Sequence, residues 1–419
     1  MIKILIIADD FTGALDSGVK FSAAGFTTKV VTDLDIDFAG ETEADVLVLC
    51  APTRHIPAAE AYHVIRRITQ RAVQARVGCI FKKTDSALRG NIGAELSAAL
   101  DGSGQQSISF IPALPTMNRV TEGGVHYIDG VPVQESVFGR DPFEPVTESY
   151  VPDLLAKQCD VPIRVISREK IKDFRAGERC IYLFDCTCKE DLEEEVEVLH
   201  RQGQTGLLAG CSGLAEILPA YLGTTSGERA VSHPNVNRMI VVCGSLNPIS
   251  CEQMDYAERY GFHRIHISPD QLLDGGSLKE GAGKALIDQL WRAYCLSEYL
   301  LIDTQQLGAD RVTAGDSMTL EEIRQRLSGR LGIILKTLLD LGADSRFIII
   351  GGDTLLAFMD AIQCRELYPV QELMPGVVLS LVPYRNRQYE VISKSGGFGE
   401  RDLLVALRDI PECRTPVVV

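Results

Sequence analysis

The chain has 419 residues, of which 45% are hydrophobic and 24% are charged, a composition typical of globular proteins. No apolar run approaches the roughly 18 to 20 residues that a membrane span needs, so we expect a soluble protein with no membrane contact. The formal net charge of −15 opposes binding to nucleic acid, and an anionic small substrate would need a local basic pocket. The N-terminal apolar run ends at Asp9, before it reaches signal-peptide length, which favours a cytoplasmic protein.

The length favours two domains at roughly 150 or more residues each. In the first half, short runs rich in Ile and Val alternate with amphipathic stretches, which is typical of an α/β fold with a largely parallel sheet. Residues 112–152 interrupt this rhythm with Pro and Gly, and predict either a functional loop system or a small β-rich excursion. Strands are expected at 2–8, 45–50, 78–82, 107–111, 180–184 and 206–209, and helices near 13–24, 58–75, 189–202 and 212–222.

Residues 223–238 are polar and turn-prone, and a new strand begins directly after them. We therefore predict two α/β domains, 1–225 and 236–419, each with a mostly parallel sheet flanked by helices, and an active site in the cleft between them. In the second half, strands are expected at 239–243, 263–267, 299–302, 346–350, 376–382 and 388–393, and helices near 247–260, 279–295 and 319–341.

Charged residues follow the expected strands of the first half, where open α/β sheets bind ligands. Asp9 and Asp10 end the first strand, Arg54 follows the second, and the run KKTDSALRGN (82–91) follows the third. Arginine binds planar anions through two hydrogen bonds, and aspartate accepts hydrogen bonds from sugar hydroxyls. Two simpler interpretations remain open: Asp10 could only cap the next helix, and 82–91 could be a surface loop of weak ion pairs.

Glycine-bearing turns follow three expected strands of the second half, in VVCGSLNP, FIIIGGDTLLAFM and ISKSGGFGERDLL. Backbone N–H groups in such turns, together with helix N-termini, could hold phosphate. A Walker A sequence is absent, because the only Gly-Lys pair, Gly283-Lys284, is followed by Ala285. If this half binds a nucleotide, it does so by another route.

Taken together, the motifs resemble one family. ADDFTGALDSG, KKTDSALRGN, the PxLPxxxRxTxxGxxY segment, GCSGLA, VCGS, GGDT, MPGVV and KSGGFG occur in the order and spacing of the four-carbon acid sugar kinases, from Ile7 to about Leu404. The resemblance implies an N-terminal domain that binds a tetronate-type acid sugar and a C-terminal domain that binds ATP. It further implies transfer of the γ-phosphoryl group to the terminal O4 hydroxyl of D-threonate, D-erythronate or 3-oxo-tetronate, with Mg²⁺ bridging the phosphates.

The resemblance also assigns site residues. We expect Asp85, which lies among cations that keep it ionised, or Asp10 to act as the catalytic base; no residue is predicted as a metal ligand. Asn118, where the family usually has Gly, and Ala87, where it commonly has Thr, leave the identity of the acid sugar open, and a homodimer is considered without support from a motif. The implied acid-sugar contacts are Asp9, Asp10, Arg54, Lys82, Asp85 and Arg89, and the implied ATP contacts are Ser245, Gly351, Gly352, Asp353, Thr354, Gly396 and Gly397.

Two other functions are considered. A haloacid-type phosphatase begins with an Asp after an apolar strand, but its D-x-D-x-T signature differs by one residue from the D-D-x-T of this chain, which turns the second carboxylate away. A non-catalytic nucleotide-binding regulator would need only the glycine-bearing turns, and would leave the charged loops of the first half without a role.

Overall fold

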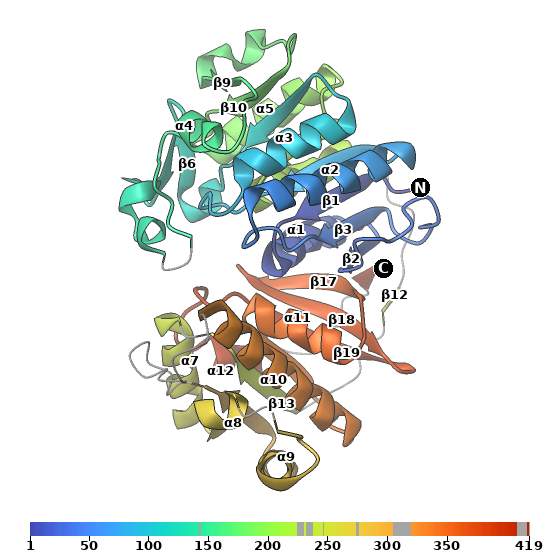
Figure 1. Cartoon of the computed structure of the whole chain (residues 1–419), viewed down its shortest axis with the longest axis vertical. Coiled ribbons are helices and arrows are strands. Elements are labelled where there is room, and N and C mark those ends of the chain that lie inside the picture. The colour runs from blue at the N-terminus through green and yellow to red at the C-terminus, as the bar shows by residue number, and fades with distance from the viewer. Residues whose placement is uncertain are drawn as a thin grey trace. The chain divides into compact units, whose positions relative to one another are not determined.

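The computed structural model describes residues 1–141, 144–223, 230–231, 238–245, 247–273, 276–304, 320–408 and 417–418. The chain divides into two compact units, Met1–Glu228 with Val418–Val419, and Arg229–Val417 (Figure 1). We refer to them as the N-terminal unit and the C-terminal unit. Most of the predicted linker, 226–235, lies outside the described residues, and what each predicted domain binds stays a prediction.

The N-terminal unit is built on a parallel sheet with the strand order β2-β3-β1-β4-β11-β5-β10-β9. Strands β1 and β3 are buried along their whole length, because their side chains on both faces of the sheet are apolar. The strands are β1 (Ile4–Ala8), β2 (Thr28–Val31), β3 (Val46–Cys50), β4 (Cys79–Lys83), β5 (Ser107–Ile111), β9 (Ile163–Ile166), β10 (Cys180–Phe184) and β11 (Leu207–Gly210).

Helices cover both faces of this sheet. One core cluster joins Leu5 and Ile7 of β1 to α2, α3 and α4, while Ile4 and Ile6, which point to the opposite face, are also fully buried. Helix α6 packs against both α1 and α5. The helices are α1 (Phe11–Ala23), α2 (Ala58–Gln74), α3 (Ile92–Ser103), α4 (Val151–Ala156), α5 (Lys189–Arg201) and α6 (Ser212–Ile217), with the short 3₁₀ turns η4 (Arg168–Asp173) and η5 (Leu218–Tyr221).

Residues 112–152 form the small β-rich excursion that was one of the two predictions. Its antiparallel strands β6 (Arg119–Glu122), β7 (Val125–Ile128) and β8 (Val131–Pro132) are joined by short turns. Single bridges tie it to the main unit, as between Thr121 and Cys186. The 3₁₀ turns of the excursion are η1 (Pro115–Met117), η2 (Val133–Glu135) and η3 (Val137–Arg140).

The C-terminal unit has the strand order β14-β15-β13-β16-β19-β18-β17, parallel from β14 to β19 and antiparallel from there. One core cluster joins the sheet to α7 and α12, and α10 packs against α11, α9 and α8. The strands are β13 (Met239–Cys243), β14 (His263–His266), β15 (Tyr299–Asp303), β16 (Arg346–Ile350), β17 (Glu366–Met374), β18 (Val377–Tyr384) and β19 (Arg387–Lys394).

The helices of this unit include the three that the sequence predicts. They are α7 (Pro248–Arg259), α8 (Pro269–Leu273), α9 (Gly281–Leu296), α10 (Leu320–Asp340), α11 (Gly352–Ala361) and α12 (Leu403–Arg408). Two short strands, β12 (Ala230–Val231) and β20 (Val417–Val418), pair with each other. None of the helices in the described ranges is long and apolar enough to cross a membrane.

The predicted α/β fold with mostly parallel sheets is confirmed, and most predicted elements agree with the structure to within two residues. The elements that sequence reasoning missed are short strands such as β2 and β9, the hairpin strand β17, and helix α3. Helix α3 lacks an amphipathic pattern because nearly all of its residues are buried, so no polar face marks the helical period.

Candidate functional site

The carboxyl ends of β3, β1 and β4 meet at one edge of the N-terminal sheet. Ala8 at the end of β1 pairs with Cys50 of β3 on one side and with Lys83 of β4 on the other. The loops that follow these three strands therefore leave the sheet side by side. They carry the acid-sugar contacts that the sequence analysis assigned, except Lys82, which lies in β4 itself.

Arg54 joins two of these loops through both carboxylates of the Asp9-Asp10 pair. Its Nε donates to Asp9 Oδ2 at 2.7 Å and its Nη1 to Asp10 Oδ2 at 2.7 Å. Asp9 is 3% exposed and Arg54 is 8% exposed, so this ion pair is largely removed from water. Asp10 also caps α1, because its Oδ1 accepts from the Gly13 N–H at 2.8 Å. The capping interpretation is thus correct, but it accounts for only one of the two oxygens.

The cations around Asp9 keep its carboxylate ionised despite its burial. Burial alone raises the pKa of Asp9, but Arg54 and then Lys82 outweigh it and lower that pKa below its ordinary value. Asp9 Oδ1 is buried and has no hydrogen-bond partner among the described residues. An unsatisfied carboxylate oxygen is costly, and a ligand hydroxyl could satisfy it.

A second ion pair forms within the loop after β4. Arg89 donates two hydrogen bonds to Asp85, from Nε to Oδ2 at 2.8 Å and from Nη2 to Oδ1 at 3.2 Å. Its Nη1 also donates to Asp141 Oδ2 at 3.3 Å. Burial by itself raises the pKa of Asp85, but Arg89 and Arg54 hold it well below its ordinary value. Asp85 is buried, so the loop is not the surface loop of weak ion pairs that was considered.

Lys82 and Lys83 are adjacent and both buried, but they have different partners. Lys82 is fully buried, and its Nζ lies 2.8 Å from Glu95 Oε2, so the structure gives its charge a structural partner. Lys83 Nζ donates to the Thr84 carbonyl at 2.8 Å, and its charge helps to lower the pKa of Asp9. It makes no ion pair among the residues that the structure describes.

Arg119, at the start of β6, is the other cation of this region without a carboxylate partner in the described part of the chain. Its Nη1 donates to Ser86 Oγ, and its charge lowers the pKa of Asp85. The guanidinium groups of Arg119 and Arg89 both lie 5.2 Å from the centre of the Phe138 ring. The site assignment by sequence left out Lys83 and Arg119. The Lys-Lys doublet and the Arg of the PxLPxxxRxT segment were the available signals.

Both departures from the family pattern have structural explanations. Asn118 has φ of +52°, a left-handed conformation that Gly adopts freely and Asn tolerates better than most residues. Ala87 is buried in a small apolar cluster with Ile128, Val133 and Val146. The two positions shape the backbone and the packing of the excursion, and the choice of acid sugar stays open.

The C-terminal unit brings its three glycine-bearing turns together in the same way. Cys243 of β13 pairs with Ile350 of β16, which pairs with Lys394 of β19, so the turns leave one edge of the sheet. A Cβ atom on Gly244 would collide with Thr354 Oγ1, and one on Gly396 would collide with Ser245 Oγ. These glycines are therefore required for close packing of the three turns.

The arrangement of these turns fits an anion. Gly351 has φ of +111° and begins α11 without a side-chain cap, so the first N–H groups of this helix are available to a phosphate. Asp353 is exposed and lies 3.3 Å from Arg324 Nη1. Gly397 is exposed, and among the described residues a Cβ atom there would meet Asn247 Nδ2 alone, at 3.4 Å.

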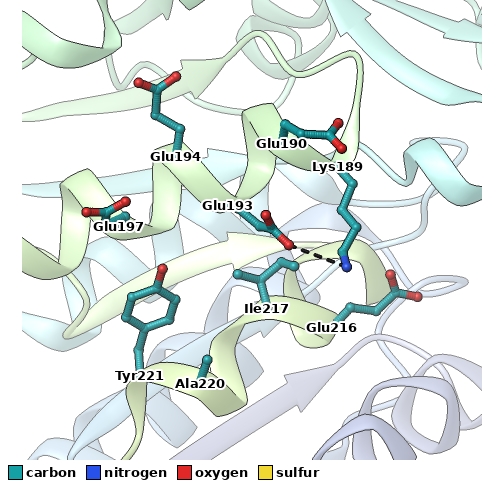
Figure 2. A pocket seen from close by; sticks show the side chains of 9 residues that line it. All are labelled: Lys189, Glu190, Glu193, Glu194, Glu197, Glu216, Ile217, Ala220 and Tyr221. Atoms are coloured by element: carbon teal, nitrogen blue, oxygen red, sulfur yellow. Dashed lines mark ion pairs between the residues drawn. The ribbon is translucent and has the colours of Figure 1, made fainter.

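Two surface pockets of the N-terminal unit differ sharply in charge. One of about 580 Å³ is lined by five glutamates of α5 and α6 (Figure 2), which disfavours an anionic ligand, and none of the predicted site residues lines it. The other, of about 320 Å³, borders Arg54 and Arg89 but none of the other assigned residues. It lies beside the charged cluster and does not enclose it.

The Arg54 pair predicts a pH-dependent loss of stability in Arg54→Gln. The variant leaves Asp9 as an unpaired buried charge, so we expect the free energy of unfolding at pH 7 to fall by about 3–5 kcal/mol in urea titrations. Asp9 has a lowered folded pKa, so its contribution to stability is present above its unfolded pKa of about 3.9 and is lost as the pH falls through the folded value. The difference between variant and wild type should therefore shrink towards pH 3.

Arg67→Gln is the matched control, because the Arg67 side chain is 55% exposed and lies 3.5 Å from an exposed Asp35. It should change the free energy of unfolding by less than about 0.5 kcal/mol. A loss in Arg54→Gln as small as in this control would show that Arg54 does not neutralise Asp9.

Comparison with known proteins gives a consistent assignment over the whole chain. The profile of a sugar-binding N-terminal domain matches residues 4–218, and that of a nucleotide-binding C-terminal domain matches residues 240–404. The chain is 27% identical over 420 residues to a D-threonate kinase of Salmonella typhimurium, covering 96% of each protein. It is 24% identical to a D-erythronate kinase of Heliobacterium modesticaldum, covering 96% of this chain and 95% of the relative.

A solved structure from Salmonella typhimurium LT2 has the same fold, with a TM-score of 0.80 at 24% identity, and covers 98% of this chain and 99% of that one. The resemblance drawn from the ordered motifs is thereby confirmed. The chain belongs to the four-carbon acid sugar kinase family, whose members join a sugar-binding N-terminal domain to a nucleotide-binding C-terminal domain.

Proposed function

We propose that this protein is an ATP-dependent kinase that phosphorylates the terminal O4 hydroxyl of a four-carbon acid sugar, namely D-threonate, D-erythronate or 3-oxo-tetronate. The family membership supports the reaction class. The acid sugar binds at the strand ends of the N-terminal unit and ATP at the glycine-bearing turns of the C-terminal unit. The two names of relatives, a D-threonate kinase and a D-erythronate kinase, support this substrate class.

The observation that carries the proposal is the balance of charges at the N-terminal strand ends. Arg54 and Arg89 are already bound to carboxylates of the protein, and Lys82 is bound to Glu95. Lys83 and Arg119 are the remaining cations, and we propose that they hold the carboxylate of the acid sugar. Asp9, whose Oδ1 lacks a partner, accepts a hydrogen bond from a substrate hydroxyl.

The assigned contacts thus divide into two roles. Arg54, Lys82 and Arg89 fix Asp9, Asp10 and Asp85 in their ionised and oriented state, and the carboxylates orient the hydroxyl groups. This division accounts for a strongly acidic protein that binds an anion, because every acidic group of the site is paired with a cation before the substrate arrives, with Arg54 shared by Asp9 and Asp10.

The proton of the O4 hydroxyl needs an acceptor, and the candidates are Asp10 and Asp85. The strongly lowered pKa of Asp85 makes it a weak base. The Asp10 side chain is the most exposed of the three aspartates, at 27%, so it is the more accessible acceptor. Phosphoryl transfer depends mainly on positioning and on stabilisation of charge, so the accessibility of Asp10 is what favours it over Asp85.

The nucleotide assignment follows from the backbone donors of the C-terminal unit. The N-terminus of α11, with Gly351, Gly352, Asp353 and Thr354, and the turn with Gly396 and Gly397 would hold the phosphates, with Ser245 between the two turns. A Mg²⁺ ion would neutralise phosphate charge. No group of three His, Cys, Asp or Glu side chains suited to a metal occurs in the described ranges, so the phosphates would supply most of its ligands.

A screen for ADP release over threonate, erythronate and their 2- and 3-oxo forms tests the proposal. We expect ATP-dependent turnover with at least one of these acids, and loss of turnover when divalent cations are chelated. Turnover that survives thorough chelation would contradict the cation requirement. Release of inorganic phosphate from simple phosphoesters would favour the phosphatase, and stabilisation by ATP without any turnover would favour the regulator.

Gly397→Val tests the assignment of ATP to the C-terminal turns. A Cβ atom at Gly397 would meet Asn247 Nδ2 at 3.4 Å among the described residues, an ordinary van der Waals distance. We therefore expect an unchanged melting temperature and a raised KM for ATP, with acid-sugar affinity retained in calorimetry. Gly329→Val in α10, where a Cβ atom meets nothing within 4 Å, is the control and should leave both affinities unchanged. A Gly397→Val enzyme that loses acid binding but keeps ATP binding would overturn the assignment.

A further inference from the structure

Lys394, the last residue of β19, is a buried cation that the proposed mechanism does not use. It is 2% exposed, and its Nζ donates to three neutral oxygens: Ser250 Oγ at 3.4 Å, the Ser395 carbonyl at 3.0 Å and the Gly396 carbonyl at 3.2 Å. It forms no ion pair with any residue that the structure describes. A charge buried without a counter-ion is costly, and its place beneath the glycine-bearing turns suggests a use.

The surroundings of Lys394 lack a compensating negative charge within the described ranges. The flanking strands place Ile350 and Val377 beside it, and α7 contributes Ser250. The titratable group that acts on it is the Cys243 thiol of β13, whose own pKa is raised to about 12 by burial. Burial accordingly lowers the pKa of Lys394 to about 8.

The hydrogen bonds of Lys394 fix the direction of two peptide groups in the 395–397 turn. The Ser395 and Gly396 carbonyls point towards the ammonium, and Ser250 Oγ also donates to the Gly396 carbonyl at 2.7 Å. In a planar trans peptide the N–H of the next residue points the opposite way. The N–H groups of Gly396 and Gly397 therefore point away from Lys394, and neither has an acceptor among the described residues.

Lys394 also contacts the neighbouring turn. Its backbone carbonyl accepts from the Gly351 N–H at 3.0 Å, which fixes the residue that begins α11. Lys394 thus orients the N–H groups of Gly396 and Gly397 through its side chain, and it holds the residue before α11 through its backbone carbonyl. Successive N–H groups that point to one side are a typical anion site.

We propose that Lys394 is the positioning residue of the phosphate site: its ammonium holds the 395–397 turn with two N–H groups presented to the nucleotide, and the arriving phosphate charge draws a proton onto Lys394. The inference rests on the proposed nucleotide site and adds to it a residue, a role and a proton balance. The only bond that this step forms is the N–H bond of the protonated amine. One proton passes from solvent to the fraction of Lys394 that is neutral.

Calorimetry of ATP binding to the full chain tests the proton balance without any mutation. At pH 8 about half of Lys394 is neutral if its pKa is about 8, so titrations in buffers of different ionisation enthalpy should give uptake of up to about half a proton. At pH 6.5 the uptake should be close to zero. The terminal phosphate of ATP is itself ionised at pH 8 and takes no part.

Two variants separate positioning from a merely structural role. Lys394→Met should weaken ATP binding about tenfold or more and abolish the proton uptake. Lys394→Arg, which stays charged at pH 8, should recover part of the affinity without uptake. Lys336→Met, at an exposed helical ion pair with Asp340, is the control and should match the wild type in affinity and uptake.

The outcomes distinguish this inference from the proposed function. If the wild type binds no ATP, the nucleotide site is wrong and the inference fails with it. If the wild type binds ATP without proton uptake at pH 8, or if Lys394→Met binds ATP as the wild type does, Lys394 does not position the site, while the proposed function stands.

Discussion

The two hydrogen bonds of Arg54, one to Asp9 and one to Asp10, are the constraint on which the N-terminal candidate site depends. A parallel sheet delivers the loops after β1, β3 and β4 to one edge, and burial there would push paired carboxylates to take up protons. Arg54 prevents this for Asp9 and leaves Asp10 free to cap α1 as well. Arg54 thus keeps buried Asp9 ionised and holds both carboxylates in place. Carboxylates held in this way can accept hydrogen bonds from hydroxyl groups.

Under the proposed function, the two units hold an anion by different means. The N-terminal unit would use side-chain charges: cations bound to protein carboxylates set the geometry, and Lys83 and Arg119 would bind the ligand. The C-terminal unit uses backbone N–H groups, and its glycines are needed where Gly244 and Gly396 abut neighbouring side chains. A nucleotide offers several phosphate oxygens to such donors, whereas a small acid sugar offers one carboxylate and several hydroxyls.

The fold class could be predicted from the sequence, and so could the placement of the three loops of each candidate site at one sheet edge. Buried parallel strands and the residues after them have clear patterns. The roles within the loops could not be predicted. Lys82 and Lys83 must point to opposite faces of β4, but only the structure shows that Glu95 takes Lys82. Likewise, Asn118, where the family usually has Gly, left the identity of the acid sugar open, and only the structure shows that this residue has a positive φ. Partners that are distant in sequence, such as Arg54 for Asp9, leave no local signal.

The central proposal is transfer of a phosphoryl group to the terminal O4 hydroxyl oxygen of an acid sugar. Two-dimensional phosphorus–proton NMR of the mixture formed from ATP and the acid that supports turnover tests it most directly. The account predicts one new phosphomonoester signal, in equal amount to ADP, whose phosphorus correlates with the two protons on C4. Correlation with a proton on C2 or C3, or inorganic phosphate as the only product besides ADP, would contradict it.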